Sequence, residues 1–209
     1  MFKLNKIVKV LLISDFFFNC AWGLVSPIFA LFIVQKITGD SAKAAEVAGF
    51  AALFYWTIKS FLQIPIGKYL DKNHGEKDDF WFMLIGHIIT AMVPFGYLFS
   101  TSALHIYILQ IVYAVGMAML VPSWLAVLSR HIDKGKEAFE WGLSSTTFGF
   151  ATGITGALGG VIAATYNFNA LFILCGLINL VSAFALLYIR KELYRGKNIN
   201  KHLFPFMPF

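Results

Sequence analysis

Charged residues are scarce in this chain. Only 13% of its 209 residues are Asp, Glu, Lys or Arg, whereas 58% are apolar and 17% are aromatic. Soluble domains carry about 25% charged residues, so this composition excludes an ordinary soluble protein and indicates an integral membrane protein. The formal net charge is +6, but in so apolar a chain this basic excess does not indicate a nucleic-acid partner, and we expect none.

Cysteine and catalytic motifs are also scarce. Cys20 and Cys175 each lie inside an apolar segment without metal-ligand spacing, so we expect both to be small buried apolar side chains. The sequence has no G-x-S-x-G nucleophile elbow, no H-E-x-x-H and no pair of His or Glu at metal-ligand spacing. We therefore expect a protein that is not an enzyme and needs no metal or cofactor, with an intramembrane hydrolase as the weakest alternative.

What the chain does contain is six long apolar runs. A transmembrane helix needs about 20 mostly apolar residues, and every run reaches that length. Because hydrocarbon offers the backbone no hydrogen-bond partner, runs of this kind predict helices and not a barrel. The predicted helices cover about residues 7–34, 43–70, 80–100, 103–129, 141–165 and 168–189. They form one domain over residues 1–190, followed by a basic tail at 191–209.

Basic residues between the runs predict the orientation. Lys and Arg concentrate in the cytoplasmic loops of membrane proteins. Only Lys36 and Lys43 fall on one predicted side, and fourteen fall on the other: Lys3, Lys6, Lys9, Lys68, Lys72, Lys77, Arg130, Lys134, Lys136, Arg190, Lys191, Arg195, Lys197 and Lys201. We therefore expect a multi-pass protein of the cell (inner or plasma) membrane with both termini cytoplasmic, its tail beside anionic lipid headgroups.

A short hinge separates the second and third runs. It reads Gly67-Lys68-Tyr69-Leu70-Asp71-Lys72 and resembles the G-x-x-x-D-R/K signature that follows the second transmembrane helix in transporters of the major facilitator superfamily. The resemblance implies that Gly67, Asp71 and Lys72 belong to a gating motif at the cytoplasmic surface.

Two further segments resemble the same family. Residues 110–122 are similar to its fourth-helix pattern, with Gln110 at the position of the family's arginine. The glycines of the fifth run resemble the fifth-helix motif of the family's antiporter branch. The resemblance implies an all-α, integral membrane six-helix bundle, built as two inverted three-helix repeats and equivalent to the N-terminal half of the family fold.

The glycines of the fifth run also have a direct physical interpretation. Gly149 with Gly153, and Gly156 with Gly160, form two small-xxx-small pairs. Such pairs let two helix backbones approach closely in lipid, where apolar burial gives helices little reason to associate. The spacing therefore predicts a helix-packing face.

Polar and aromatic residues inside the runs predict the wall of a cavity. They recur at spacings of three or four, which places them on one face of each helix. A charged side chain at mid-bilayer costs about 2.5 to 3.5 kcal/mol, so such residues are seldom without a function. The candidate transport path comprises Asp15, Asn19, Trp22, Ser26, Tyr55, Lys59, Gln63, Gln110 and Tyr113.

The two charged members of this set lie at similar depth. At about 1.5 Å per residue, Asp15 is about 12 Å and Lys59 about 16 Å from the cytoplasmic ends of their helices. Their depth predicts an ion pair at the lower end of the cavity. The alternative is that the pair only holds two helices together, while the other polar groups satisfy local carbonyls.

The favoured function is a secondary transporter that moves a small-molecule substrate by alternating access, in contact with membrane lipid. The resembled family has twelve helices, so we expect a homodimer or a separate second half. The resemblance implies that, in a homodimer, Asp71 would face the N-terminal end of the fifth helix of the other copy. A non-transporting scaffold or sensor, and a truncated half-transporter, stay open as alternatives.

Overall fold

The computed structural model describes residues 4–73 and 76–195. Across this part of the chain the elements are helical, and six segments are long and apolar enough to cross a membrane, as predicted. The long helices are α1 (Lys6–Val25), α3 (Ser41–Asn73), α4 (Glu76–Tyr97), α5 (Ala103–His131), α6 (Glu137–Thr165) and α7 (Phe168–Leu186). The short segments are η1 (Ser26–Ile28), α2 (Phe29–Ile33), η2 (Val34–Thr38), η3 (Leu187–Ile189) and α8 (Arg190–Arg195).

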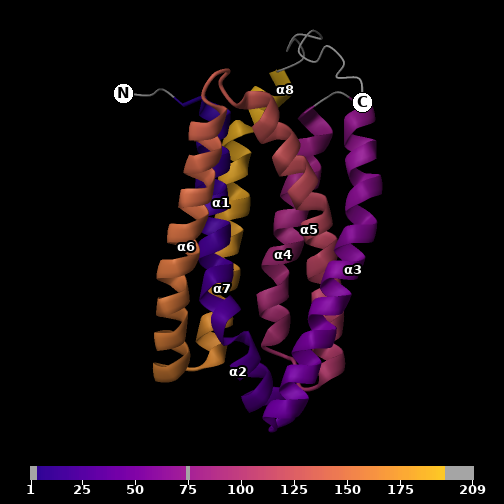
Figure 1. The fold of residues 1–209 in the computed structure, drawn as a ribbon, viewed down its shortest axis with the longest axis vertical. Helices are drawn as coiled ribbons and strands as arrows, with labels where there is room; N and C mark the ends of the chain where they lie inside the picture. Colours follow the sequence, from indigo (N-terminus) through magenta and orange to yellow (C-terminus); the bar gives the residue numbers. More distant parts are fainter. Residues whose placement is uncertain (1–3, 74–75, 196–209) are drawn as a thin grey trace.

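The start of α1, the end of α3 and α8 lie at the same end of the bundle (Figure 1). The start of α4 and the connection between α5 and α6 lie there as well (Figure 1). This end carries most of the basic residues of the described chain, and we call it the basic end. The grouping agrees with the side on which the sequence predicts the excess of Lys and Arg.

The first predicted helix is interrupted at Pro27. α1 ends at Val25, a 3₁₀ turn (η1) contains the proline, and the span continues as α2 and the π-helical turn η2. Proline lacks the backbone N–H and clashes with the preceding turn, which favours a break. Pro65, Pro94 and Pro122 instead lie inside α3, α4 and α5, which stay continuous. The predicted first span over 7–34 is therefore confirmed and reaches Thr38, but it is not one regular α-helix.

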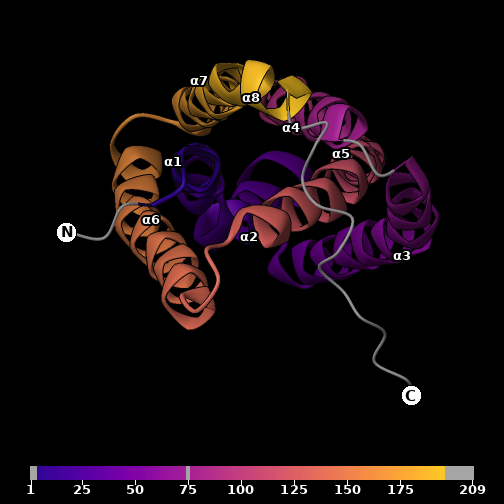
Figure 2. The same ribbon diagram turned by 90° about the horizontal axis from the view of Figure 1, so that it is seen from above.

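The packing of the long helices has an internal symmetry. α1 packs against α6 and α7, α5 packs against α3 and α4, and α4 and α7 pack together. The helices can be divided into two sets in chain order, the first with α1, α3 and α4 and the second with α5, α6 and α7. The first helix of each set then packs on the second and third helices of the other set. This exchange agrees with two inverted three-helix repeats. Seen along the bundle, α3 and α6 lie at the two sides, with α1 and α5 between them (Figure 2).

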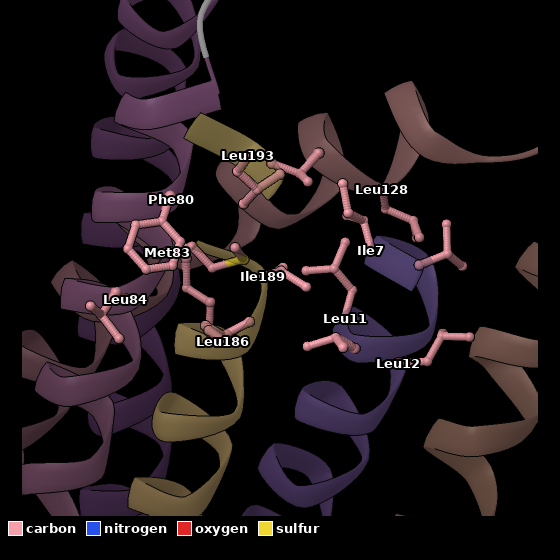
Figure 3. Packing of buried hydrophobic residues seen from close by; sticks show 14 of the residues in the cluster. Ile7, Leu11, Leu12, Phe80, Met83, Leu84, Leu128, Leu186, Ile189 and Leu193 are labelled. Atoms are coloured by element: carbon pink, nitrogen blue, oxygen red, sulfur yellow. The ribbon is translucent and has the colours of Figure 1, made fainter. Parts of the chain in front are cut away.

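A hydrophobic cluster fills the bundle near the basic end. Figure 3 shows Leu11 of α1, Phe80 and Met83 of α4 and Leu186 of α7 pointing toward one another. Leu193 of α8 joins this cluster and is buried. α8 therefore packs against the bundle, whereas the predicted division of the chain at residue 190 stays a prediction, and the tail beyond residue 195 lies outside the described residues.

Reciprocal hydrogen bonds also join α1 to α7. The hydroxyl of Ser14 donates to the Ser182 carbonyl at 3.0 Å, and the Ser182 hydroxyl donates to the Ser14 carbonyl at 2.7 Å. Both serines are fully buried. Small polar side chains of this kind fix two helices against each other because their bonds need close backbone approach.

Candidate functional site

Three rings from three helices stack across the middle of the bundle. Tyr113 of α5 lies between Trp22 of α1, at a centroid distance of 4.1 Å, and Tyr55 of α3, at 5.1 Å. The Tyr113 and Tyr55 planes are tilted by only 20°. We call Trp22, Tyr113 and Tyr55 the aromatic stack. All three belong to the predicted transport path, so the structure brings together residues that the sequence placed on separate helices.

Lys59 extends the aromatic stack on α3. Its ammonium lies 4.8 Å from the ring centroid of Trp56 and 5.5 Å from that of Tyr55, within cation–π range. It also lines a hollow of about 370 Å³, bordered by Trp56, Lys59, Ser60, Gln63, Ile64 and Val121. We call this space the Lys59 hollow. Two predicted path residues, Lys59 and Gln63, therefore share one cavity.

The predicted ion pair between Asp15 and Lys59 is not formed. The ion pairs of the described chain do not include it, and Asp15 does not line the Lys59 hollow. Tyr113 stands between the rings of α1 and α3, and Lys59 turns to rings of its own helix. Asp15 and Lys59 lie at similar depth, but α5 separates their helices and keeps the two charges apart.

The remaining path residues have mixed surroundings. The Asn19 amide donates to the backbone carbonyl of Asp15 at 2.7 Å, one turn away. Ser26 is exposed at the start of η1. Gln110 donates to the Tyr97 hydroxyl at 3.1 Å and so links α5 to α4. By contrast, Nε1 of Trp22 is buried without a hydrogen-bond partner among the described atoms, which leaves a donor available beside the aromatic stack.

The residues of the predicted gating motif lie in the last part of α3. Gly67 is half-buried, whereas Asp71 and Lys72 are exposed at the basic end. A Cβ at Gly67 would meet nothing within 4 Å. No contact within the described chain therefore assigns these residues a partner, and their gating role stays a prediction.

A cluster of charged residues at the basic end was not predicted from the sequence. Arg130, at the end of α5, donates a hydrogen bond to the fully buried carboxylate of Asp79, at the start of α4. Glu76 lies 4.0 Å from Arg130 and 3.3 Å from Nδ1 of His131. The acids are favoured here by the N-terminal dipole of α4. A signal existed in the sequence, since acids open one run and Arg130-His131 closes the next.

The connection between α5 and α6 carries a further ion pair. Lys136 donates to Asp133 at 2.8 Å, and this hydrogen bond raises the pKa of the Lys136 amine. The backbone N–H of Asp133 lies 3.4 Å from Glu140, which is buried in the first turn of α6. These contacts fix the loop at the basic end.

The predicted packing glycines of α6 divide into two groups. A Cβ at Gly156 would meet Pro27 at 3.6 Å and the Gly23 carbonyl at 3.7 Å, so Gly156 faces α1 and η1. At Gly149, Gly153 and Gly160 nothing lies within 4 Å. A packing role for these three glycines stays a prediction, and within the described chain they form an open face.

The closest approach of α6 to α1 occurs at a glycine that the spacing did not identify. A Cβ at Gly159 would collide with the backbone of Leu24, and one at Gly23 would lie 3.0 Å from Cα of Thr152. Gly23 and Gly159 therefore permit the contact between α1 and α6. Both are buried.

Comparison with known proteins gives matches over nearly the whole chain. The family model described as Major Facilitator Superfamily matches residues 11–208. An uncharacterized MFS-type transporter of Methanocaldococcus jannaschii is 26% identical over 204 residues, which are 96% of this chain and 50% of that protein.

Two further relatives share one description. The proton-coupled antiporter flippase LtaA of Staphylococcus haemolyticus is 30% identical over 177 residues, which are 83% of this chain and 42% of that protein. The protein of the same description from Staphylococcus saprophyticus is 24% identical over 116 residues, which are 52% of this chain and 29% of that protein. This chain thus spans half or less of the length of these curated relatives.

Proposed function

Because the chain belongs to the major facilitator superfamily and is a multi-pass membrane protein, we propose that it forms one half of a transporter that moves a small solute by alternating access. A second six-helix half, for which a second copy of this chain is one candidate, completes the path. The proposal gives both termini a cytoplasmic position in the cell membrane, so that the basic end faces the cytoplasm.

The observation that carries this proposal is the aromatic stack with the Lys59 hollow beside it. A ring stack from α1, α5 and α3, a cation and the donor Nε1 of Trp22 lie together within the membrane-spanning part. Concave sites with aromatic walls and a few polar groups are typical of small-molecule binding. A non-transporting scaffold would have no need to leave the Lys59 ammonium without a carboxylate partner, and Nε1 of Trp22 without a hydrogen-bond partner, within the described chain.

The side helices support an incomplete assembly. α3 and α6 are the least buried spans of the described chain, and large apolar side chains such as Phe61 and Phe150 are 76% and 64% exposed. The open glycines Gly149 and Gly153 lie on α6. These faces suit lipid or a second half, and small residues favour another helix.

Alternating access can be tested without a known substrate. In a background that lacks Cys20 and Cys175, we would introduce Asn19→Cys and Gln63→Cys and treat sealed vesicles of both orientations with a thiol reagent that cannot cross membranes. We expect both positions to react from each side. Ala21→Cys, at a fully buried position, serves as the unreactive control.

Reaction of Asn19→Cys and Gln63→Cys from one side only, or from neither, would support the scaffold and contradict alternating access. The two halves need a separate test because the accessibility result does not identify the partner.

Cysteine cross-linking tests the homodimer. Asp71 and Thr146 are exposed, and Thr146 shares its helix face with Gly149 and Gly153, whereas the neighbouring Ser144 is buried. We expect Asp71→Cys with Thr146→Cys to give a covalent dimer, and Asp71→Cys with Leu158→Cys, near the other end of α6, to give none. A chain that stays monomeric by light scattering and never cross-links would rule out the homodimer.

A further inference from the structure

Lys59 lies inside a membrane span and has no carboxylate partner among the residues that the structure describes. The described ion pairs join Lys6 to Glu192, Arg130 to Asp79 and Glu76, and Lys136 to Asp133, and none includes Lys59. The faces of Trp56 and Tyr55 attract its ammonium but supply no negative charge. A buried or half-buried charge is costly unless it is paired, so the Lys59 environment favours an anion from outside the helix.

The walls of the Lys59 hollow match the needs of an anion. Ser60 supplies a hydroxyl donor and Gln63 an amide donor, both within about one turn of Lys59 on α3. Trp56, Ile64 and Val121 form apolar walls. The ammonium attracts an anion, and the two donors can satisfy its remaining oxygens.

Asp15, the acid that the sequence paired with Lys59, does not lie where it could compete with an external anion. Asp15 belongs to α1, on the other side of the aromatic stack, and does not border the hollow. No acidic residue is among the residues that line the hollow. The charge that the described chain presents to this cavity is therefore positive.

We propose that the Lys59 hollow binds an anionic group, a carboxylate or a phosphate, and that the solute of this protein is an anion. The second clause rests on the proposed transport function, whereas the binding site does not. Lys59 supplies the charge, Ser60 and Gln63 supply hydrogen bonds, and Trp56 packs against the body of the ligand.

The anionic group has two sources, a free solute or a lipid headgroup, and the experiment separates them. The purified chain would be placed in nanodiscs of phosphatidylcholine and titrated with benzoate and inorganic phosphate, with benzylamine and benzyl alcohol as cationic and neutral probes. Quenching of tryptophan fluorescence and thermal stability report binding. A second set of nanodiscs contains phosphatidylglycerol and no soluble probe.

We expect benzoate or phosphate to bind and to stabilise the protein, with Lys59→Gln weakening the affinity at least about tenfold, as for loss of a charge-assisted hydrogen bond. Lys59→Arg should retain binding, and Gln63→Leu should weaken it while keeping the charge. Lys68→Gln, an exposed position on the same helix, should change nothing. Stabilisation by phosphatidylglycerol alone, lost in Lys59→Gln, assigns the site to a lipid headgroup.

Equal binding of benzylamine, or anion binding that survives in Lys59→Gln, would overturn the proposal. So would a Lys59→Gln variant whose only defect is loss of assembly, because Lys59 would then pair with an acid of the second half. If Lys59→Gln does not fold, anion binding by Gln63→Leu and Lys59→Arg tests the proposal instead.

The binding site and the transport function can be refuted separately. Anion binding without two-sided thiol access would refute transport and retain the binding site, whereas two-sided access without anion binding would refute the binding site alone.

Discussion

The indole of Trp22 on α1 lies against the ring of Tyr113 on α5, with centroids 4.1 Å apart and planes tilted by 38°. α1 and α5 are the first helices of the two repeats, and each packs mainly on helices of the other set. The ring contact therefore joins the centres of the two repeats directly. Because Tyr113 also stacks on Tyr55, a change at this one residue affects both sides of the bundle.

Tyr113→Leu should lower the thermal stability of the purified protein, because it removes two ring contacts that are each worth about 0.5 to 1.5 kcal/mol beyond apolar burial. Tyr113→Phe should retain most of the stability. Thermal unfolding in detergent, followed by tryptophan fluorescence, measures the effect. Tyr166→Leu, at a 76% exposed position, is the matched control, and equal losses for Tyr113→Leu and Tyr166→Leu would contradict the role of the stack.

Asp15→Asn and Lys59→Met should have additive effects on stability. The two side chains share no contact, and separated sites normally add to within about 0.5 kcal/mol. A double-mutant cycle of thermal unfolding measures the coupling. A double mutant that is clearly more stable than the sum of the single changes would restore the ion pair that the sequence predicted.

Asp79 and Arg130 should show the opposite behaviour. Arg130→Met leaves the buried Asp79 carboxylate without its guanidinium, and a buried group left unsatisfied costs about 1 to 3 kcal/mol or more when charged. Combining Asp79→Asn with Arg130→Met should recover part of the loss. The control is Lys136→Gln in the half-buried loop pair with Asp133, which should have little effect. Identical losses for Arg130→Met and Lys136→Gln would contradict a special cost of unpairing Asp79.

Gly159→Ala should disrupt the contact between α1 and α6, because its Cβ would collide with the Leu24 backbone, and overpacking costs about 1 to 3 kcal/mol. Gly153→Ala has open space and should be tolerated by the single chain. Thermal unfolding and size-exclusion chromatography measure both variants. If Gly153→Ala leaves stability unchanged but abolishes assembly, the open face of α6 is an interface, whereas a destabilised Gly153→Ala chain would mean that Gly153 packs within the chain.

The sequence alone determined the class of the protein and the number of its membrane helices. A helix that spans the hydrocarbon core requires a long apolar run, and the sequence contains six such runs. The hinge motif and the patterns of the fourth and fifth runs led to the family, which the family match over residues 11–208 confirmed. These features are local, since each is contained within one segment.

Only the tertiary structure decided which polar residues meet. Depth along a helix can be counted from the sequence, but rotation and neighbours cannot, so Asp15 and Lys59 were paired wrongly. Lys59 instead meets Trp56 and Tyr55, and Asp79 meets Arg130, from a helix end that the polar-face argument did not consider. The glycine spacing likewise could not show that Gly159 takes the closest contact, because that depends on where the backbone of α1 passes α6. In lipid, the burial of apolar side chains gives helices little reason to associate in one particular arrangement. Side-chain contacts between helices therefore fix the arrangement of the site.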